Sequence, residues 1–177
     1  MALLPVLTVP DPLLTAKARP VRPDEFGPDL VQRVHDMAET MYAAPGVGLA
    51  APQVGDLRRF LVCDPGGKLD PEGRMHGERL LVLINPVLVE VADEIESCEE
   101  GCLSVPGFWE TVVRPSWARV RFQDESGSPH EVLYEGYPAV VVQHEIDHLD
   151  GVLILDHVSR LKRSRYLRAR AKAKQKA

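Results

Sequence analysis

Two histidines and a glutamate near the end of the chain have the spacing of a metal-dependent catalytic site. The segment QHEIDH contains His144, Glu145 and His148, and it lies between Pro138 and Gly151, which predict the start and the end of a helix. On a helix the two histidines lie one turn apart on the same face, where they can bind one metal ion. Glu145 can then exchange protons with a water on that metal. This H-E-x-x-H pattern is typical of metal-dependent hydrolases, and the alternative is an amphipathic helix with two surface histidines.

A catalytic zinc-like site needs a third protein ligand and one open position. In one known extension of the motif, a third histidine follows a glycine, but here Ile154 stands where that histidine is required after Gly151. Asp150, Asp156 and His157 are close in sequence, yet none has a recognised ligand spacing. We therefore expect the third ligand upstream.

Two upstream cysteines are candidates for the third ligand. Cys98 and Cys102 are not followed by a second cysteine pair, which excludes an all-cysteine tetrahedral site. One thiolate joined to two histidines would leave a fourth position open. Gly101 would let the backbone fold tightly beside Cys102. Chemistry alone does not separate the two cysteines, and either could be a buried structural residue.

A glycine-rich run at residues 46–55 (GVGLAAPQVG) allows a close approach of the backbone to another group. It has neither the G-K-[ST] ending nor the G-x-G-x-x-G spacing of a phosphate-binding loop. The alternative is a buried turn between a helix and a strand. If the run lines a site, Gln53 is its only side chain able to donate a hydrogen bond.

Length and composition indicate one globular domain. The chain has 177 residues, of which 45% are hydrophobic and 27% charged. Its three cysteines fit free thiols in a reducing compartment better than a disulfide framework. The N-terminus lacks the basic region of a secretory signal, and no apolar run is long enough to span a membrane.

Charge divides the chain unevenly. Residues 158–177 contain nine Lys and Arg and no acidic residue, whereas the other 157 residues contain 12 basic and 26 acidic ones. The acidic body argues against general nucleic-acid binding, and the basic tail could be a solvated, fraying terminus. We expect a metallohydrolase domain at 1–157 and a basic extension at 158–177.

Hydrophobic periodicity predicts an α+β fold. An extended arm at 1–27 precedes an amphipathic helix at 28–44, and the active helix follows a set of antiparallel strands. The strands are expected at 57–63, at 80–91 in two pieces broken at Asn85-Pro86, and as a hairpin at 117–123 and 131–135. Residues 64–79 are expected to form a loop.

Three runs together resemble the signature motifs of peptide deformylases: GVGLAAPQ at 46–53, EGCLS at 100–104 and QHExxH at 143–148. They occur in the family's order and with similar spacing, and the likeness covers about residues 1–160. Three matching motifs are far more specific than H-E-x-x-H alone. The resemblance implies antiparallel sheets packed around a central metal-binding helix, with an N-terminal helix and a basic C-terminal helix or tail.

The resemblance also implies residue roles. The metal ligands would be Cys102, His144 and His148, and Glu145 would be the acid/base. The Gln53 side chain and the Leu103 backbone N–H would face the developing oxyanion. The implied substrate-binding positions are Val47, Gly48, Gly101, Tyr137, Val140 and Val141, although the apolar ones could simply be core.

The implied activity is removal of the formyl group from N-formylmethionine at the start of nascent polypeptides, by attack of a metal-bound hydroxide on the formyl carbon. The implied cofactor is one divalent metal, Fe²⁺ in the cell, with Ni²⁺, Co²⁺ or Zn²⁺ as substitutes. The implied location is the cytoplasm, with docking to the ribosome through the C-terminal tail and no membrane or specific DNA partner. The long 64–79 loop and Trp109, at a rim position that is often polar or basic, leave the preference beyond methionine open.

Two other classes of function compete. A broader H-E-x-x-H metallopeptidase would use the same metal and glutamate to cleave unblocked peptides. A ribosome- or RNA-binding protein with a degenerate metal site would use the basic tail, but the intact Gln53, Cys102 and Glu145 argue against degeneracy. Such a binding protein should purify without stoichiometric metal.

Overall fold

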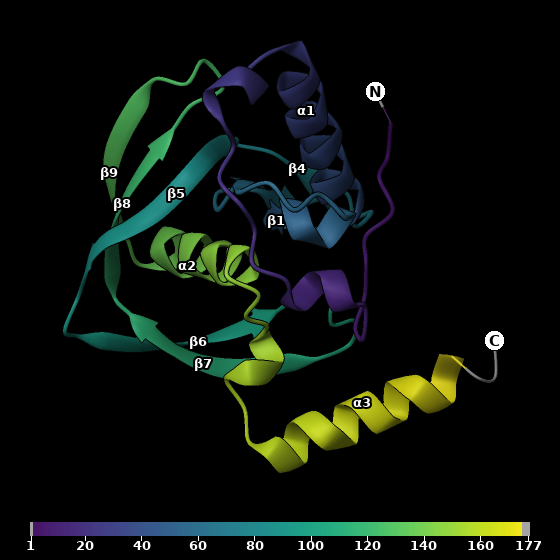
Figure 1. Cartoon of the computed structure of the whole chain (residues 1–177). Helices are drawn as coiled ribbons and strands as arrows, with labels where there is room; N and C mark the ends of the chain where they lie inside the picture. Colours follow the sequence, from purple (N-terminus) through teal and green to yellow (C-terminus); the bar gives the residue numbers. More distant parts are fainter. Residues whose placement is uncertain (1, 175–177) are drawn as a thin grey trace.

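A central helix, α2 (Tyr137–Leu149), organises the protein. The computed structural model describes residues 2–174, and in it α2 lies between a five-stranded sheet and a two-stranded sheet (Figure 1). All strand pairs within the sheets are antiparallel. The predicted α+β architecture with antiparallel sheets around this helix is confirmed.

The five-stranded sheet forms the larger layer. Its strands lie in the order β1-β2-β5-β8-β9. Their bounds are β1 Gly48–Ala50, β2 Phe60–Cys63, β5 Leu81–Val91, β8 Trp117–Gln123 and β9 Pro129–Glu135. Strand β1 is at the edge of the sheet, so the side of β1 that faces away from β2 has no strand partner among residues 2–174.

The prediction of two strand pieces at 80–91 is wrong, because β5 is one strand with an irregular register. Its pairing with β8 shifts between Ile84 and Val87. Asn85 has φ 53. Its side-chain Nδ2 donates hydrogen bonds to Val21 O at 2.9 Å and to Gln123 Oε1 at 2.9 Å. These hydrogen bonds occupy Asn85 at a β-bulge, so Pro86 is accommodated without ending the strand.

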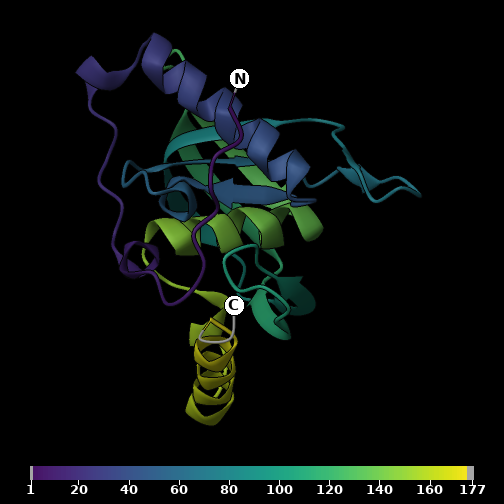
Figure 2. The same ribbon diagram turned by 90° about the vertical axis from the view of Figure 1, so that its right-hand side faces the viewer.

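Two strand pairs were not predicted from the sequence. β6 (Ile95–Gly101) pairs with β7 (Trp109–Pro115) beneath α2 in Figure 1. Within the expected 64–79 loop, β3 (Lys68–Leu69) pairs with β4 (Met75–His76). This β3–β4 hairpin projects from the body of the protein (Figure 2).

Helix α1 (Pro28–Ala43) agrees with the predicted amphipathic helix. Leu30, Val34, Met37 and Met41 are fully buried at helical spacing. They pack with core residues of β1 and β2, among them Phe60. The helix therefore covers the face of the sheet that points away from α2, a layering visible in Figure 1.

The basic tail forms a helix. This helix, α3, covers Arg160–Lys174. Within residues 2–174 it is preceded by four short 3₁₀ helices (Pro12–Thr15, Pro23–Glu25, Ala51–Val54 and Ile154–Asp156). Its Tyr166 and Leu167 are half-buried against a cluster that includes Val105 and Phe108. No helix within residues 2–174 is long and apolar enough to cross a membrane.

Candidate metal centre

Three possible ligand atoms, two from α2 and one from the residue after β6, lie close together. His144 and His148 project from α2 and Cys102 follows directly after β6, and one ligand atom of each lies within 4.8 Å of the others. The Cys102 Sγ and the His148 Nε2 are 3.2 Å apart. Cys98, the alternative that the sequence left open, lies outside this group.

A buried acidic side chain orients one of the histidines. Glu100 Oε2 lies 2.7 Å from His144 Nδ1, which leaves the opposite ring nitrogen facing Cys102 and His148. Arg114 donates to both Glu100 oxygens and, through Nη1, to Asp147 Oδ2 at 2.9 Å. The ring orientation is therefore fixed by a chain of charged hydrogen bonds.

The two histidines of this group differ in their electrostatics, because burial and the neighbouring His144 lower the pKa of His148 well below its ordinary value. Burial alone would lower the pKa of His144, but hydrogen bonds with Cys102 and Glu100 outweigh it and raise the pKa well above the ordinary value. Burial opposes ionisation of Glu100, yet hydrogen bonds from His144 and Arg114 lower its pKa to about 2. Glu100 is therefore a carboxylate, and the space beside His144 favours positive charge.

Glu145 is buried beside the ligands with one oxygen unpaired. Its Oε2 has no hydrogen-bond partner within residues 2–174, and burial raises the pKa of the carboxyl to about 7. Gly48 makes room for it, because a Cβ at that position would lie 2.2 Å from Glu145 Oε1. A carboxyl with this pKa can both accept and donate a proton near neutral pH.

Gln53 is held rigidly next to Cys102. Its Oε1 accepts from Ala50 N at 2.8 Å, and its Nε2 donates to Ser104 Oγ at 3.1 Å and, more weakly, to Cys102 Sγ at 3.7 Å. The Leu103 backbone N–H, on the turn after Cys102, donates to no group in the described part of the chain. Both N–H groups thus lie beside Cys102.

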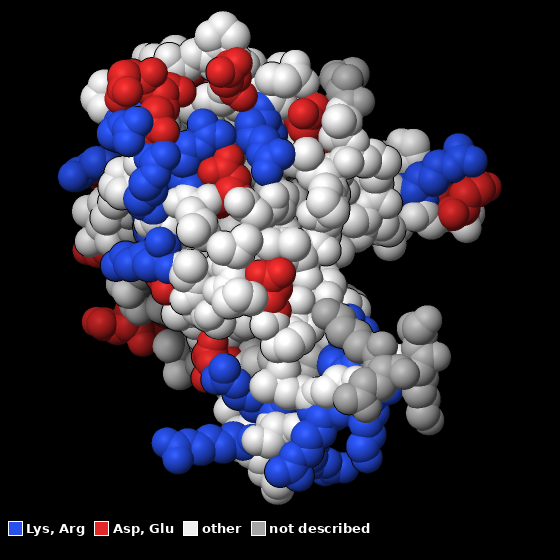
Figure 3. Space-filling model, turned by 45° about the vertical axis from the view of Figure 1, so that its right-hand side comes forward, with Lys and Arg blue, Asp and Glu red and all other residues white. Residues whose placement is uncertain are grey.

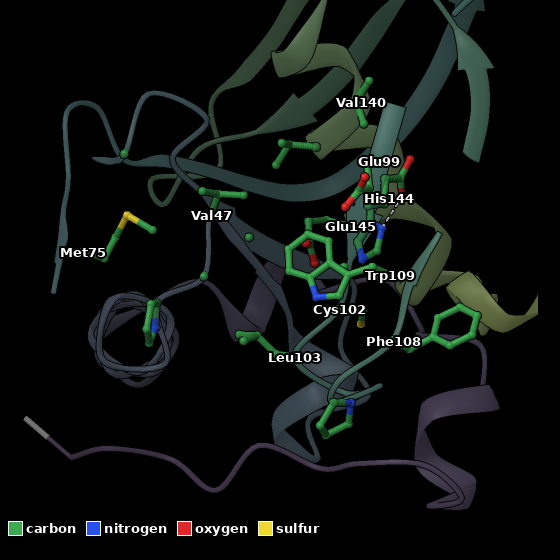
Figure 4. A pocket seen from close by; sticks show the side chains of 18 of the residues that line it. Val47, Met75, Glu99, Cys102, Leu103, Phe108, Trp109, Val140, His144 and Glu145 are labelled. Atoms are coloured by element: carbon green, nitrogen blue, oxygen red, sulfur yellow. Dashed lines mark hydrogen bonds and ion pairs between the residues drawn. The ribbon is translucent and has the colours of Figure 1, made fainter. Parts of the chain in front are cut away.

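A cavity of ≈ 560 Å³ opens from this centre to the surface (Figure 4). Val140 and Val141 from α2, Val47 and Leu103 give it an apolar wall, and Tyr137 lines it while remaining half-exposed. The sequence-predicted positions that line the cavity are Val47, Gly48, Gln53, Gly101, Cys102, Leu103, Tyr137, Val140, Val141, His144 and Glu145. His148 lies behind this surface with 1% of its area exposed.

The residues present fit a single divalent metal. One thiolate and two imidazoles are a known three-ligand set that leaves one position open. The buried Glu145 Oε2 beside these ligands lacks a hydrogen-bond partner in the described residues, as expected where a water completes the site.

Several functional residues were missed from the sequence. Glu100 and Arg114 orient His144, Ser104 holds Gln53, and Leu69 and Met75 reach the cavity from the β3–β4 hairpin. Glu100 and Ser104 lie within the EGCLS run at 100–104, which was their only sequence signal, and no role was assigned to either of them. The other contacts depend on strand pairings that periodicity did not predict.

Fold and centre together define a metal-dependent hydrolase of the H-E-x-x-H class, with a cysteine as third ligand candidate. The family model described as "Polypeptide deformylase" matches residues 3–164. The chain belongs to the polypeptide deformylase family. Members of this family are metal-dependent enzymes that remove the N-formyl group from nascent peptides.

Individual relatives match between 89% and 100% of the chain. The peptide deformylase of Cellvibrio japonicus is 46% identical over 178 residues, covering 100% of this chain and 98% of its own. The crystal structure of peptide deformylase from Ehrlichia chaffeensis in complex with actinonin has a TM-score of 0.86 and 35% identity, with 98% of each chain covered. A Met-Ala-Ser-bound class I type b enzyme from Acinetobacter baumannii has a TM-score of 0.80 and 33% identity, covering 89% of this chain and 99% of that one.

Proposed function

We propose that Cys102, His144 and His148 hold one divalent metal ion and that Glu145 moves the protons needed to hydrolyse the formyl amide of N-formylmethionyl peptides. The observation that carries this assignment is the convergence of the three ligand atoms beside a buried, unpaired Glu145 oxygen at the bottom of an open apolar cavity. When bound, the metal supplies Lewis-acid chemistry, polarising the formyl oxygen and making hydroxide available near neutral pH.

Fe²⁺ is the metal we assign in the cell, with Ni²⁺, Co²⁺ or Zn²⁺ able to replace it. A mixed thiolate and imidazole set suits these cations better than Mg²⁺ or Ca²⁺, which prefer oxygen ligands. A thiolate beside Fe²⁺ is prone to oxidation, so the iron form should lose activity in air. None of Cys63, Cys98 and Cys102 is in a disulfide, which supports a reducing cytoplasm as the working compartment.

Glu145 has the position and the pKa for both proton transfers. Its unpaired Oε2 takes a proton from the attacking water and later gives it to the nitrogen of the departing methionine, so the carboxylate is regenerated. A pKa of about 7 makes both protonation states accessible at neutral pH.

Gln53 and Leu103 stabilise the negative charge that develops on the formyl oxygen. The 3.7 Å contact from Gln53 Nε2 to Cys102 Sγ is weak, so a developing oxyanion can replace it. The free Leu103 N–H supplies a second donor. Each such donor typically contributes about 3 kcal/mol to transition-state binding.

The apolar wall of the cavity receives the methionine side chain. Val47, Val140 and Val141 face it, with Tyr137 at its mouth. The substrate backbone lies between Gly48 on β1 and Gly101 on β6, since the outer edges of both strands lack strand partners in residues 2–174. An extended peptide can pair with such free edges.

We also propose that residues 1–157 form the catalytic domain and that α3, in the 158–177 extension, tethers it to the ribosome. Arg165, Arg168 and Lys172 are exposed on one face of α3, opposite the half-buried Tyr166 and Leu167. Lys and Arg cover this helix in Figure 3. Such a face suits the phosphates of ribosomal RNA, with affinity that falls steeply as salt rises.

Neutralising that face tests the tether without removing the helix. The triple variant Arg165→Gln, Arg168→Gln, Lys172→Gln should co-sediment less with ribosomes at low salt, with a smaller salt dependence. A control that neutralises Lys17, Arg22 and Arg121 makes the same change in net charge elsewhere on the surface. Equal loss in both variants, or no loss in either, would rule out α3 as the tether.

The activity itself is tested by a deformylation assay. The protein reconstituted anaerobically with Ni²⁺ or Fe²⁺ should release formate from formyl-Met-Ala and leave unblocked Met-Ala peptides intact. Cleavage of the unblocked peptides would favour the metallopeptidase alternative. Absence of stoichiometric metal and of turnover would favour a pure binding protein.

A further inference from the structure

The cavity extends beyond its methionine wall to two apolar surfaces that are largely exposed. Leu69 on the β3–β4 hairpin is 58% exposed and Trp109 on β7 is 64% exposed, yet both line the same cavity. Figure 4 shows Met75, from the hairpin, and Trp109 on opposite sides of the pocket. Large apolar side chains that face each other across an open cleft mark a binding surface more often than chance exposure.

The hairpin wall is built from a cross-strand pair. Leu69 and Met75 are directly opposite in the β3–β4 register, so their side chains share one face of the hairpin. The Met75 sulfur folds back over the hairpin base, where a Cβ added at Gly67 would meet it at 3.1 Å. Lys68, which adjoins Leu69, does not line the cavity and belongs to the opposite face.

A buried carboxylate anchors this hairpin to the body. Asp64, 1% exposed, accepts from the Tyr42 hydroxyl at 2.8 Å and from the backbone N–H groups of Glu78 and Arg79 at 2.8 and 3.0 Å. These bonds connect both ends of the hairpin to α1. The Leu69–Met75 pair is therefore held at the cavity rim.

The opposite wall is formed by Trp109 on β7. Trp109 pairs with Gly101 across the β6–β7 ribbon, and its ring atoms would lie 3.0 Å from a Cβ added at Gly101. The indole thus lies over the backbone next to Cys102. Any side chain at Gly101 would displace the ring.

We propose that the Leu69–Met75 pair and Trp109 form an outer subsite that selects an apolar side chain at the third residue of the formylated peptide. The inference rests on the proposed function. Side chains of an extended peptide alternate, so the third residue points to the same side as the methionine, about 7 Å further along the chain. The side chain of the second residue points the other way and does not contact the Leu69–Met75 pair or Trp109. The β3–β4 hairpin thereby extends the substrate preference of the enzyme from the methionine to the third residue of the peptide.

The test compares kcat/KM of the Ni²⁺-loaded protein on formyl-Met-Ala-Leu, formyl-Met-Ala-Asn and formyl-Met-Leu-Ala. The wild type should favour leucine over asparagine at the third position by about tenfold, the lower end for an apolar pocket, because this one is open. In Leu69→Ser/Met75→Ser, and independently in Trp109→Ser, the ratio should fall to about twofold. Lys68→Ser should keep the wild-type ratio.

A wild-type protein without this preference, or variants that keep the full ratio, would overturn the outer subsite. So would a preference that follows leucine at the second position. A binding experiment distinguishes failure of the outer subsite from failure of the proposed function. It measures the affinity for the product peptides Met-Ala-Leu and Met-Ala-Asn by tryptophan fluorescence. An inactive protein that still binds Met-Ala-Leu about tenfold more tightly would refute the hydrolysis but retain the subsite.

Discussion

Replacing Gly48 by alanine should disable Glu145 without removing the metal. The added Cβ would lie 2.2 Å from Glu145 Oε1, 2.7 Å from its Cδ and 2.8 Å from its Cγ. Ordinary van der Waals contact begins at 3.4 Å, so the carboxylate must move by about 1.2 Å. A displacement of roughly 1 Å in a catalytic group can cost about 10²-fold in rate. We therefore expect kcat on formyl-Met-Ala to fall by about 10²-fold.

Three measurements make this prediction specific. Metal content after dialysis should match that of the wild type, because the three atoms nearest to the added Cβ all belong to Glu145. Gly48→Ala combined with Glu145→Ala should be hardly slower than Glu145→Ala alone, since the two changes remove the same function. Gly27→Ala is the control, because a Cβ there meets no atom within 4 Å. Turnover of Gly48→Ala within threefold of the wild type would refute the reasoning.

Three further substitutions test other parts of the account. Glu145→Ala should retain its metal and lose roughly 10²–10⁴-fold in rate, and near wild-type turnover would remove Glu145 from the mechanism. Glu100→Gln should weaken metal affinity about 10–100-fold in a chelator competition, because His144 loses its charged partner; unchanged affinity would contradict that role. Asp64→Ala should lower the free energy of unfolding in urea by about 2–3 kcal/mol, since it leaves the Tyr42 hydroxyl and three backbone N–H groups, those of Gly66, Glu78 and Arg79, without their acceptor. An unchanged urea midpoint would show that Asp64 does not anchor the hairpin.

The active helix was predictable because its signals are local. The H-E-x-x-H spacing, Pro138 and Gly151 all lie within one short segment, and helix geometry alone places His144 and His148 together. The amphipathic pattern of α1 is equally local. Such features do not depend on knowing which distant segments are neighbours.

The choice between Cys98 and Cys102 could not be made from the residues alone. It depends on where β6 ends relative to α2, and β6 itself carries Glu96, Glu99 and Glu100 rather than an alternating apolar pattern. Pairing with β7, which connects Gly101 to Trp109 at one end, stabilises this strand instead. Family resemblance indicated Cys102, and the geometry groups Cys102 with the histidines.

The outer subsite also could not be predicted from the sequence, for a related reason. The 64–79 segment is rich in glycine, proline and charge, which predicts a loop, but Asp64 and a Leu69–Met75 pair organise it into a hairpin. A two-residue strand is too short for any periodicity to be visible. The role of the hairpin at the cavity can be recognised only in the folded structure, where Leu69 and Met75 line the same cavity as Trp109.

The most direct test of the account is the dependence of activity on metal at the three proposed ligands. Metal-free protein titrated anaerobically with Ni²⁺ should release formate from formyl-Met-Ala in proportion to added metal, up to one ion per chain. Cys98→Ser should follow the same titration, whereas Cys102→Ser should stay inactive and lose its metal on dialysis. Saturation of Cys102→Ser at the wild-type stoichiometry and rate, or full turnover without metal, would contradict the assignment.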